Sequence, residues 1–213
     1  MRARGFGFTA ITAVLLLSCA KPSTTLVSGL PQGSALTLPK GWQMVDLKAQ
    51  SSDLTLNNPL NVGPEVVDAR AFSPDPTELS AGKIIFDGTA PYGILHIRQF
   101  SQEQIAETSI RDLRDGVFPF DKTLAKNPAY IKVITQEPVT GGNAFGEHLV
   151  FSVRLPSSAT TDGVEKSVTI DQTVLLDPAT QQVSVLFVAC NSDCFEEFQP
   201  QIDGIVNSWR TTI

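Results

Sequence analysis

Apolar and polar residues alternate through most of the second half of the chain. Four segments with this period follow one another, at residues 130–139, 145–155, 164–177 and 182–190. Leu149, Phe151 and Val153, for example, are separated by single residues and therefore share one face of a strand. The links between the segments are short and of turn composition, which suits antiparallel neighbours. The pattern predicts an antiparallel meander with one buried face.

Two other segments repeat their apolar residues with the period of a helix. The first begins at Ser101, with Gln104 in the capping-box position, and its apolar stripe consists of Ala106, Ile110, Leu113 and Val117. The second closes the chain, and Asp193 with Glu196 predicts its capping box. Its stripe consists of Phe195, Phe198, Ile202, Ile205, Val206 and Trp209. Pro200 predicts a kink or a second helical segment there.

The first hundred residues have a less regular pattern. Residues 34–47 surround a Pro-Lys-Gly turn and predict a short hairpin. Residues 51–82 have no sustained period and contain several prolines, so they predict a long loop or insertion with at most a short helical turn. Strands are predicted at residues 83–86 and 93–100, on either side of turn residues.

The first nineteen residues have the pattern of a secretion signal. Two arginines precede an uncharged stretch at residues 6–17, which spans about 18 Å as a helix and is too short for a hydrocarbon core of about 30 Å. The tetrapeptide Leu16-Leu17-Ser18-Cys19 resembles the lipobox of bacterial lipoproteins, in which the signal is cut before the cysteine and lipid is attached to its sulfur. The resemblance implies a signal peptide at 1–18, lipid attachment at Cys19 and a lipidated, flexible tether at 19–34.

A lipid on Cys19 would tether the protein to a membrane without a membrane span. Ala20 stands where an inner-membrane retention signal usually has Asp. The analogy with Gram-negative lipoproteins therefore favours the outer membrane, with the domain facing the periplasm of the bacterial cell envelope. Without the two arginines of the signal, the chain has 14 basic and 22 acidic side chains, a net charge of −8. Phosphates are neutralised by clustered Lys and Arg, so this charge argues against nucleic acid as a partner.

Cys190 and Cys194 lie where an apolar strand pattern gives way to an acidic helical one. Export would place them where disulfides persist, and a disulfide between them is the favoured interpretation. Free thiols, redox chemistry and a metal site completed by His96 or His148 stay open as alternatives, although both histidines are more simply interpreted as polar-face residues of a sheet. The spacing differs from the C-x-x-C of disulfide oxidoreductases, and only a short segment follows Cys194, which argues against a thioredoxin-like fold.

The other chemistry-bearing residues predict no catalytic site. The sequence has no G-x-S-x-G, Walker A, H-E-x-x-H or EF-hand pattern, and its two histidines give a Ser-His-Asp triad little to build on. Asp112, Asp115 and Asp121 are interpreted as capping and solvated residues rather than calcium ligands. Trp42 and Trp209 are interpreted as core residues. We therefore expect neither an enzyme nor a cofactor.

The segment Leu38-Pro39-Lys40-Gly41-Trp42 and the end of the chain together resemble the PsbP-like family. At the end of the chain the similarity lies in a strand at Val183–Val188, a polar break, and the helix positions Phe198, Ile202, Ile205, Ser208 and Trp209. The resemblance extends to bacterial envelope proteins such as DcrB. It implies an α-β-α sandwich, in which an antiparallel sheet has helices on both faces, and a non-enzymatic role. The predicted class is accordingly α/β of the α+β type, with a single domain at 35–213. The insertion at 51–82 and the cysteine pair depart from the family pattern.

The expected function is that of a membrane-anchored, non-catalytic envelope lipoprotein that acts as a binding or accessory module for a protein or a small ligand. A copper or zinc carrier that uses Cys190 and Cys194 is one alternative, and a structural subunit of an envelope complex is another. We expect the ligand surface at the loop 51–82 and at the sheet face that bears His148 and Arg154.

Overall fold

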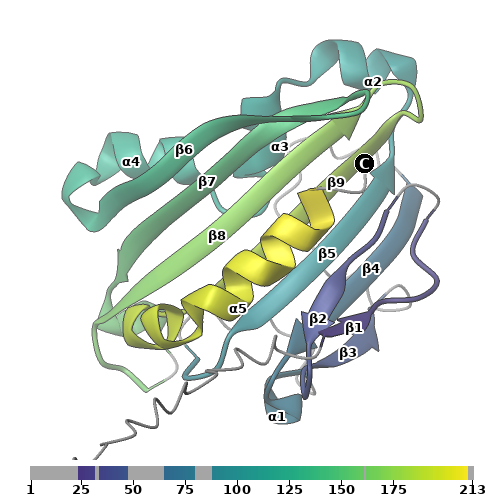
Figure 1. Cartoon of the computed structure of the whole chain (residues 1–213). Helices are drawn as coiled ribbons and strands as arrows, with labels where there is room; N and C mark the ends of the chain where they lie inside the picture. Colours follow the sequence, from purple (N-terminus) through teal and green to yellow (C-terminus); the bar gives the residue numbers. More distant parts are fainter. Residues whose placement is uncertain (1–23, 32–33, 48–64, 80–87, 161, 211–213) are drawn as a thin grey trace, which may run out of the picture.

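Nine strands form the framework of the part of the protein that the structure describes. The computed structural model describes residues 24–31, 34–47, 65–79, 88–160 and 162–210 (Figure 1). The strands are β1 (Thr24–Leu26), β2 (Thr37–Pro39), β3 (Gln43–Asp46), β4 (Glu65–Ser73), β5 (Tyr92–Gln99), β6 (Ile131–Gly141), β7 (Ala144–Leu155), β8 (Lys166–Asp177) and β9 (Gln182–Asn191). Seven of them form an antiparallel sheet in the order β3-β4-β5-β9-β8-β7-β6, and β1 pairs with β2 in a separate small sheet.

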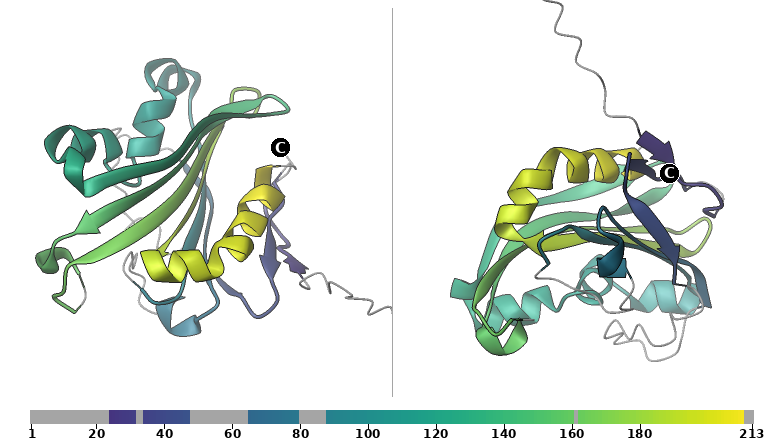
Figure 2. Two further views of the ribbon diagram at one scale, coloured as in Figure 1. Left: turned by 60° about the vertical axis from the view of Figure 1, so that its left-hand side comes forward. Right: turned by 90° about the horizontal axis from the view of Figure 1, so that it is seen from below.

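Helices lie on both faces of the large sheet. They are α1 (Pro76–Leu79), α2 (Gln102–Glu107), α3 (Ile110–Asp115), α4 (Phe120–Lys126) and α5 (Ser192–Arg210). Short 3-10 turns occur at Pro128–Tyr130 and Ser157–Ala159. Helix α5 crosses one face, and α2, α3 and α4 lie on the opposite face (Figure 2). The predicted α+β sandwich is therefore confirmed.

The predicted meander is confirmed as well, because β6, β7, β8 and β9 pair in succession as antiparallel neighbours. The prediction of a single buried face is wrong for β8 and β9, which are buried on both faces. In β8, Val168 and Ile170 pack against Phe120 of α4, whereas Val174 and Leu176 pack beneath α2 and α3. These residues alternate along the strand, so one face of the meander packs against the three short helices.

Helix α5 covers the other face with its apolar stripe. Ile202, Ile205 and Trp209 are fully buried against strands of the large sheet. The helix continues through Pro200, so the predicted second helical segment does not form. The predicted cap at Asp193 is wrong: the side-chain Oδ1 of Asn191 accepts the hydrogen bond from the backbone N–H of Cys194, at 2.9 Å. Asn191 ends β9 and is better placed, since the helix already begins one residue after it.

The helix predicted from Ser101 is divided into α2 and α3. Thr108 is extended and ends α2, and Ser109 begins α3 through a second capping box with Asp112. The backbone N–H and the hydroxyl of Ser109 donate to the carboxylate of Asp112, and the hydroxyl accepts from the backbone N–H of Asp112. These bonds satisfy the first amides of a new helix. Ile110 packs on the core as predicted, but in α2 the contact is made by Ile105, whereas Ala106 of the predicted stripe is exposed.

The first part of the chain corrects three predictions. Within the predicted tether 19–34, residues 24–26 form β1, which gains backbone hydrogen bonds to β2. The predicted hairpin at 34–47 does have its turn, since Trp42 N donates to Pro39 O, but β2 pairs with β1 and β3 pairs with β4. Within the predicted loop 51–82, residues 65–73 form β4, the neighbour of the edge strand β3, and α1 provides the short helical turn.

Some predictions fall on residues that the structure does not describe. These are the signal at 1–18, Cys19, the first part of the loop 51–82 and the strand at residues 83–86. In the part of the chain that is described, no helix is long and apolar enough to cross a membrane.

Candidate functional site

The two cysteines form a disulfide, as predicted. Cys190 lies at the end of β9 and Cys194 in the first turn of α5, with their Cα atoms 6.0 Å apart, a separation that is usual for disulfides. Both side chains are buried in the core cluster under α5. The bond joins strand to helix at one corner of the molecule and leaves neither sulfur as a thiolate for a metal ion.

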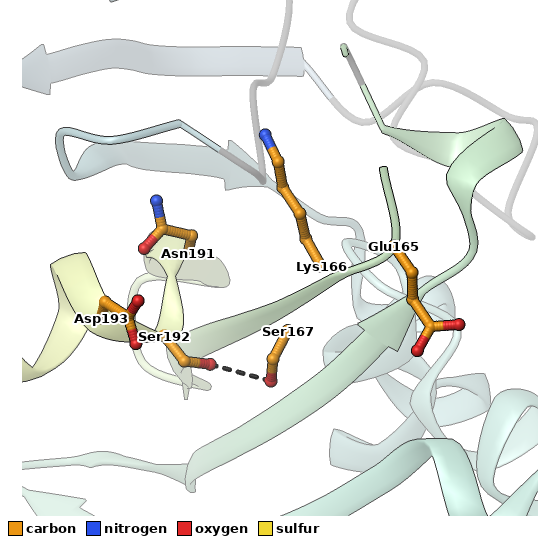
Figure 3. A pocket seen from close by; sticks show the side chains of 6 residues that line it. All are labelled: Glu165, Lys166, Ser167, Asn191, Ser192 and Asp193. Atoms are coloured by element: carbon orange, nitrogen blue, oxygen red, sulfur yellow. Dashed lines mark hydrogen bonds between the residues drawn. The ribbon is translucent and has the colours of Figure 1, made fainter. Parts of the chain in front are cut away.

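A pocket of about 350 Å³ opens at the same corner, between the start of β8 and the first turn of α5 (Figure 3). It is lined by Glu165, Lys166, Ser167, Asn191, Ser192 and Asp193. Asn191 is held from two directions, because it caps α5 and its Nδ2 donates to Gly88 O at 3.0 Å. Lys166 forms an ion pair with Asp162, with Nζ and Oδ2 3.0 Å apart. The lining therefore combines hydroxyls with charges of both signs on a fixed corner of the fold.

A row of four hydroxyls leads away from this pocket across the sheet. The hydroxyl of Ser192 donates to that of Ser167 at 2.9 Å (Figure 3) and is 3.0 Å from the hydroxyl of Thr169. Thr169 is in turn 2.9 Å from Ser152 on β7. This hydroxyl row joins the first residue of α5 to β8 and β7 on the face that α5 crosses.

His148 lies farther along the same face and links two carboxylates. Its Nδ1 is 3.1 Å from Oε1 of Glu137 on β6, and its Nε2 is 2.9 Å from Oδ1 of Asp171 on β8. The side chain is buried, which corrects its interpretation as an ordinary polar-face residue. Because each ring nitrogen faces a carboxylate oxygen, the imidazole joins β6 to β8 across β7. This geometry suits a cross-strand link rather than a general base that activates a nucleophile.

The structure does not bring His148 together with the cysteines. In the strand register Cys190 is opposite Thr169, which is opposite Ser152, whereas His148 lies four residues from Ser152 along β7. This corresponds to about 13 Å along the strands and about 10 Å across them. Among the described residues there is no group of three or more His, Cys, Asp and Glu side chains that could hold a metal ion.

The second histidine, His96, is buried on the opposite face of the sheet. Burial, together with the positive charge of Arg98, lowers the pKa of His96 to about 4. The Nε of Arg98 donates to Nε2 of His96 at 3.4 Å, which requires the neutral ring as acceptor. His96 is therefore a neutral core residue near pH 7 and not an exposed polar one.

The three acids near the first helices have structural roles. Asp112 caps α3. Asp115, Asp121 and Glu147 surround the buried guanidinium of Arg114 at ion-pair distances of 2.8, 2.6 and 2.9 Å. The interpretation of Asp112 as a capping residue is thus correct, whereas the other two acids are ion-paired rather than simply solvated. Arg114, which no sequence pattern singled out, fastens α3 to α4 and β7.

A second hollow, of about 480 Å³, lies between α5 and the β1–β2 sheet. Its walls are formed by Thr24, Thr37, Pro39, Lys40, Pro200, Gln201, Gly204, Ile205 and Ser208. Nearby, the indole N–H of Trp42 donates to Oε1 of Gln201 at 2.8 Å, and the ring packs on Phe72 and Phe198. Trp209 is fully buried, so the interpretation of both tryptophans as packing residues is supported, although Trp42 is only partly buried.

Arg154, on the sheet face where a ligand surface was expected, is exposed and lies 3.4 Å from Glu165, one of the lining residues of the 350 Å³ pocket. The 350 Å³ pocket therefore lies at the edge of the expected sheet face.

Sequence reasoning missed Lys166, Ser192 and Asp171. The one available signal was Asp171, an acid inside an apolar strand, because a buried Asp is rare unless it is paired.

The known proteins to which the chain is similar are solved structures. No family model matches the chain, and no curated protein does. Among solved structures it is similar to the cyanobacterial PsbP protein CyanoP of Synechocystis sp. PCC 6803, with 15% identity over 90% of this chain and 94% of that one and a TM-score of 0.47. It is also similar to the Ran-binding protein Mog1p of Saccharomyces cerevisiae, with 9% identity over 90% of this chain and 98% of that one and a TM-score of 0.45. Both TM-scores are below 0.5, so the α+β sandwich rests on the strand order and on the helices packed on both faces of the sheet, as described above.

Proposed function

We propose that the protein is a lipoprotein of the bacterial cell envelope, anchored through Cys19 in the outer membrane and facing the periplasm, where it acts as a non-catalytic binding or accessory module. The observation that carries this proposal is the use of its cysteines. One follows a lipobox-like tripeptide, and the other two pair in a disulfide, a bond that persists in exported proteins and rarely in the cytosol.

The binding role is supported by the pocket beside Lys166 and the hydroxyl row that continues from it. Disulfide, cap and strand ends fix the pocket on rigid elements, as a binding site requires. The metal-carrier alternative would need Cys190 and Cys194 as thiolates, and the disulfide removes both, so we do not propose it.

The anchor is tested by intact mass and fractionation of the full chain produced in a Gram-negative host. The expected product lacks residues 1–18, has the added mass of a diacylglyceryl group and an N-acyl chain, and leaves the membrane fraction with detergent but not with high salt. Cys19→Ala should abolish the added mass, and the matched Cys190→Ala/Cys194→Ala variant should keep it. An unmodified Cys19 in the parent protein would refute the anchor.

The binding role is tested with a photo-crosslinking residue placed at Ser167 in living cells, and with a control at Lys132 on the edge strand β6. We expect a discrete crosslinked partner at Ser167 that is lost in Lys166→Glu. Equal crosslinking at both positions would contradict a binding role of the pocket. A hydrolase or redox activity abolished by one point substitution would contradict the non-catalytic assignment.

A further inference from the structure

The chain is hydrogen-bonded into the domain from Thr24 onward, only five residues after the proposed lipid attachment at Cys19. Thr24, Thr25 and Leu26 pair with β2, and Val27 N donates to Leu36 O at 2.8 Å. Strand β2 is in turn fastened to α5, because Thr37 N donates to the hydroxyl of Ser208 at 3.0 Å. The attachment point of the anchor is therefore the β1–β2 side of the molecule and not a point on a long tether.

Covalent geometry limits how far this side can be from the lipid. Thr24 is five residues after Cys19, and an extended chain spans at most about 3.6 Å per residue, so the two Cα atoms are within about 18 Å of each other. Helix α5 alone, with 19 residues, is about 28 Å long. The domain is longer than the segment that connects it to Cys19, so its β1–β2 side stays near the bilayer.

The surface at this side has a composition suited to the headgroup layer of a membrane. We call it the anchor-side surface and define it by Leu26 of β1, Lys40 after β2, and Pro200, Gly204 and Ser208 of α5. Leu26 has 67% of its surface exposed, and Lys40 is the one charged residue among the described residues that line the 480 Å³ hollow. The exposed walls of that hollow are mostly apolar, which suits the boundary between lipid headgroups and acyl chains.

The charges of α5 also favour the anchor-side surface as the side that faces the membrane. Its exposed acids Asp193, Glu196 and Glu197 lie in the first two turns, at the end that carries the 350 Å³ pocket. The second half borders the anchor-side surface, and among its described residues Asp203 is the one acid. Anionic lipids repel carboxylates and attract lysine, so this distribution favours the second half of α5 as the membrane side.

We propose that the anchor-side surface lies against the phospholipid headgroups of the bilayer that holds the Cys19 lipid, with Leu26 in the interface and Lys40 beside lipid phosphates. The proposal rests on the lipidation of Cys19 proposed above. It deepens that function, because it turns the opposite end of α5, and with it the 350 Å³ pocket, away from the membrane and toward the periplasm.

The test uses full-chain protein whose lipidation has been established by mass, reconstituted in vesicles of phosphatidylethanolamine and phosphatidylglycerol. A fluorophore is attached at Leu26→Cys or, as a matched control, at Val164→Cys. Both parent residues are exposed and apolar, and Val164 adjoins the residues of the 350 Å³ pocket. A nitroxide on the lipid headgroup should quench the label at position 26 at least about threefold more than the label at position 164. Lys40→Glu should reduce this difference and Lys126→Glu, on the far face, should not.

Each other outcome overturns the proposal. Equal quenching at the two positions in lipidated protein would refute the membrane contact and leave the anchor intact. Stronger quenching at position 26 by a nitroxide deep in the acyl region would replace the headgroup contact with acyl-chain binding. Crosslinking of Leu26→Cys to a protein in place of lipid quenching would assign the surface to a protein partner. If Cys19 carries no lipid, the mass measurement shows that the proposed function has failed first.

Discussion

Replacing Arg114 by methionine should be among the most damaging single changes on the α3–α4 side of the protein. Its guanidinium is buried between the carboxylates of Asp115, Asp121 and Glu147 and lies 4.9 Å above the ring of Phe120. Methionine keeps the apolar contact with the ring but removes the charge. Three carboxylates then remain close together without a cation.

The expected cost follows from the burial of these groups. Removing one partner of a fully buried ion pair usually costs about 3–5 kcal/mol. Here the three carboxylates keep 20–36% of their side-chain surface exposed, so water compensates part of the loss. We expect the free energy of unfolding to fall by about 3 kcal/mol, toward the lower end of that range. For a domain of this size the melting temperature would fall by about 6–12 °C.

Arg111→Met is the matched control, because Arg111 belongs to the same helix and pairs with the same Asp121, at 3.1 Å, but is 75% exposed. An exposed pair contributes at most about 1 kcal/mol, so this variant should stay close to the parent protein. The assay is urea unfolding at pH 7, followed by circular dichroism and tryptophan fluorescence. If Arg114→Met loses no more stability than Arg111→Met, the buried cluster does not fasten α3 and α4 as described.

Three further changes have defined outcomes. The pKa of His96 is about 4 in the folded protein and about 6.5 when unfolded, so the unfolded state binds more protons between these values. Lowering the pH from 7 to 5 should therefore remove about 2 kcal/mol of unfolding free energy from the parent protein that His96→Gln does not lose, and parallel pH profiles would contradict this. The double variant Cys190→Ala/Cys194→Ala should unfold with about 2 kcal/mol less free energy than the oxidised parent, the entropy of a five-residue loop, and a reductant should no longer affect its urea midpoint. Asn191→Ala should cost about 1–2 kcal/mol in urea unfolding and Asp193→Ala less than about 0.5 kcal/mol, and the reverse order would restore Asp193 as the cap.

The second half of the fold could be predicted because its sequence pattern and its packing agree. Leu149 and Phe151 are buried on one face of β7, as their alternation predicts, and the stripe that includes Ile202 and Ile205 is the buried face of α5. The alternation does not reveal that the other face of β7 is buried as well, at Val150. A period of two or of 3.6 residues is nevertheless enough to identify both elements.

Strand β4 was missed because its burial pattern differs from simple alternation. Ala69 and Ala71 are fully buried but have little preference for strands, and the charged Asp68 and Arg70 interrupt the apolar residues. These two charges satisfy each other, with Arg70 Nε 2.7 Å from Asp68 Oδ1. A sequence pattern contains no information about such pairing, so the segment was interpreted as a loop.

The candidate site was predictable only in part, for a related reason. The disulfide followed from the spacing of Cys190 and Cys194 and from the inferred compartment. The role of His148 depends on Glu137 and Asp171, which are distant in sequence and become neighbours only through the register of three strands. Register is a property of the folded sheet, so neither the buried link nor the 350 Å³ pocket could be derived from local periodicity.

The proposed binding pocket and the proposed membrane contact lie at opposite ends of helix α5. Its first turn is fixed by Asn191 and by the disulfide at Cys194, beside the 350 Å³ pocket. Its second half is fixed to the N-terminal strands by Ser208 and by the hydrogen bond between Trp42 and Gln201. These two sets of contacts share no residue and are separated by much of a helix about 28 Å long. Loss of the disulfide should therefore weaken the pocket without moving the membrane contact, and changes at Ser208 should have the opposite effect.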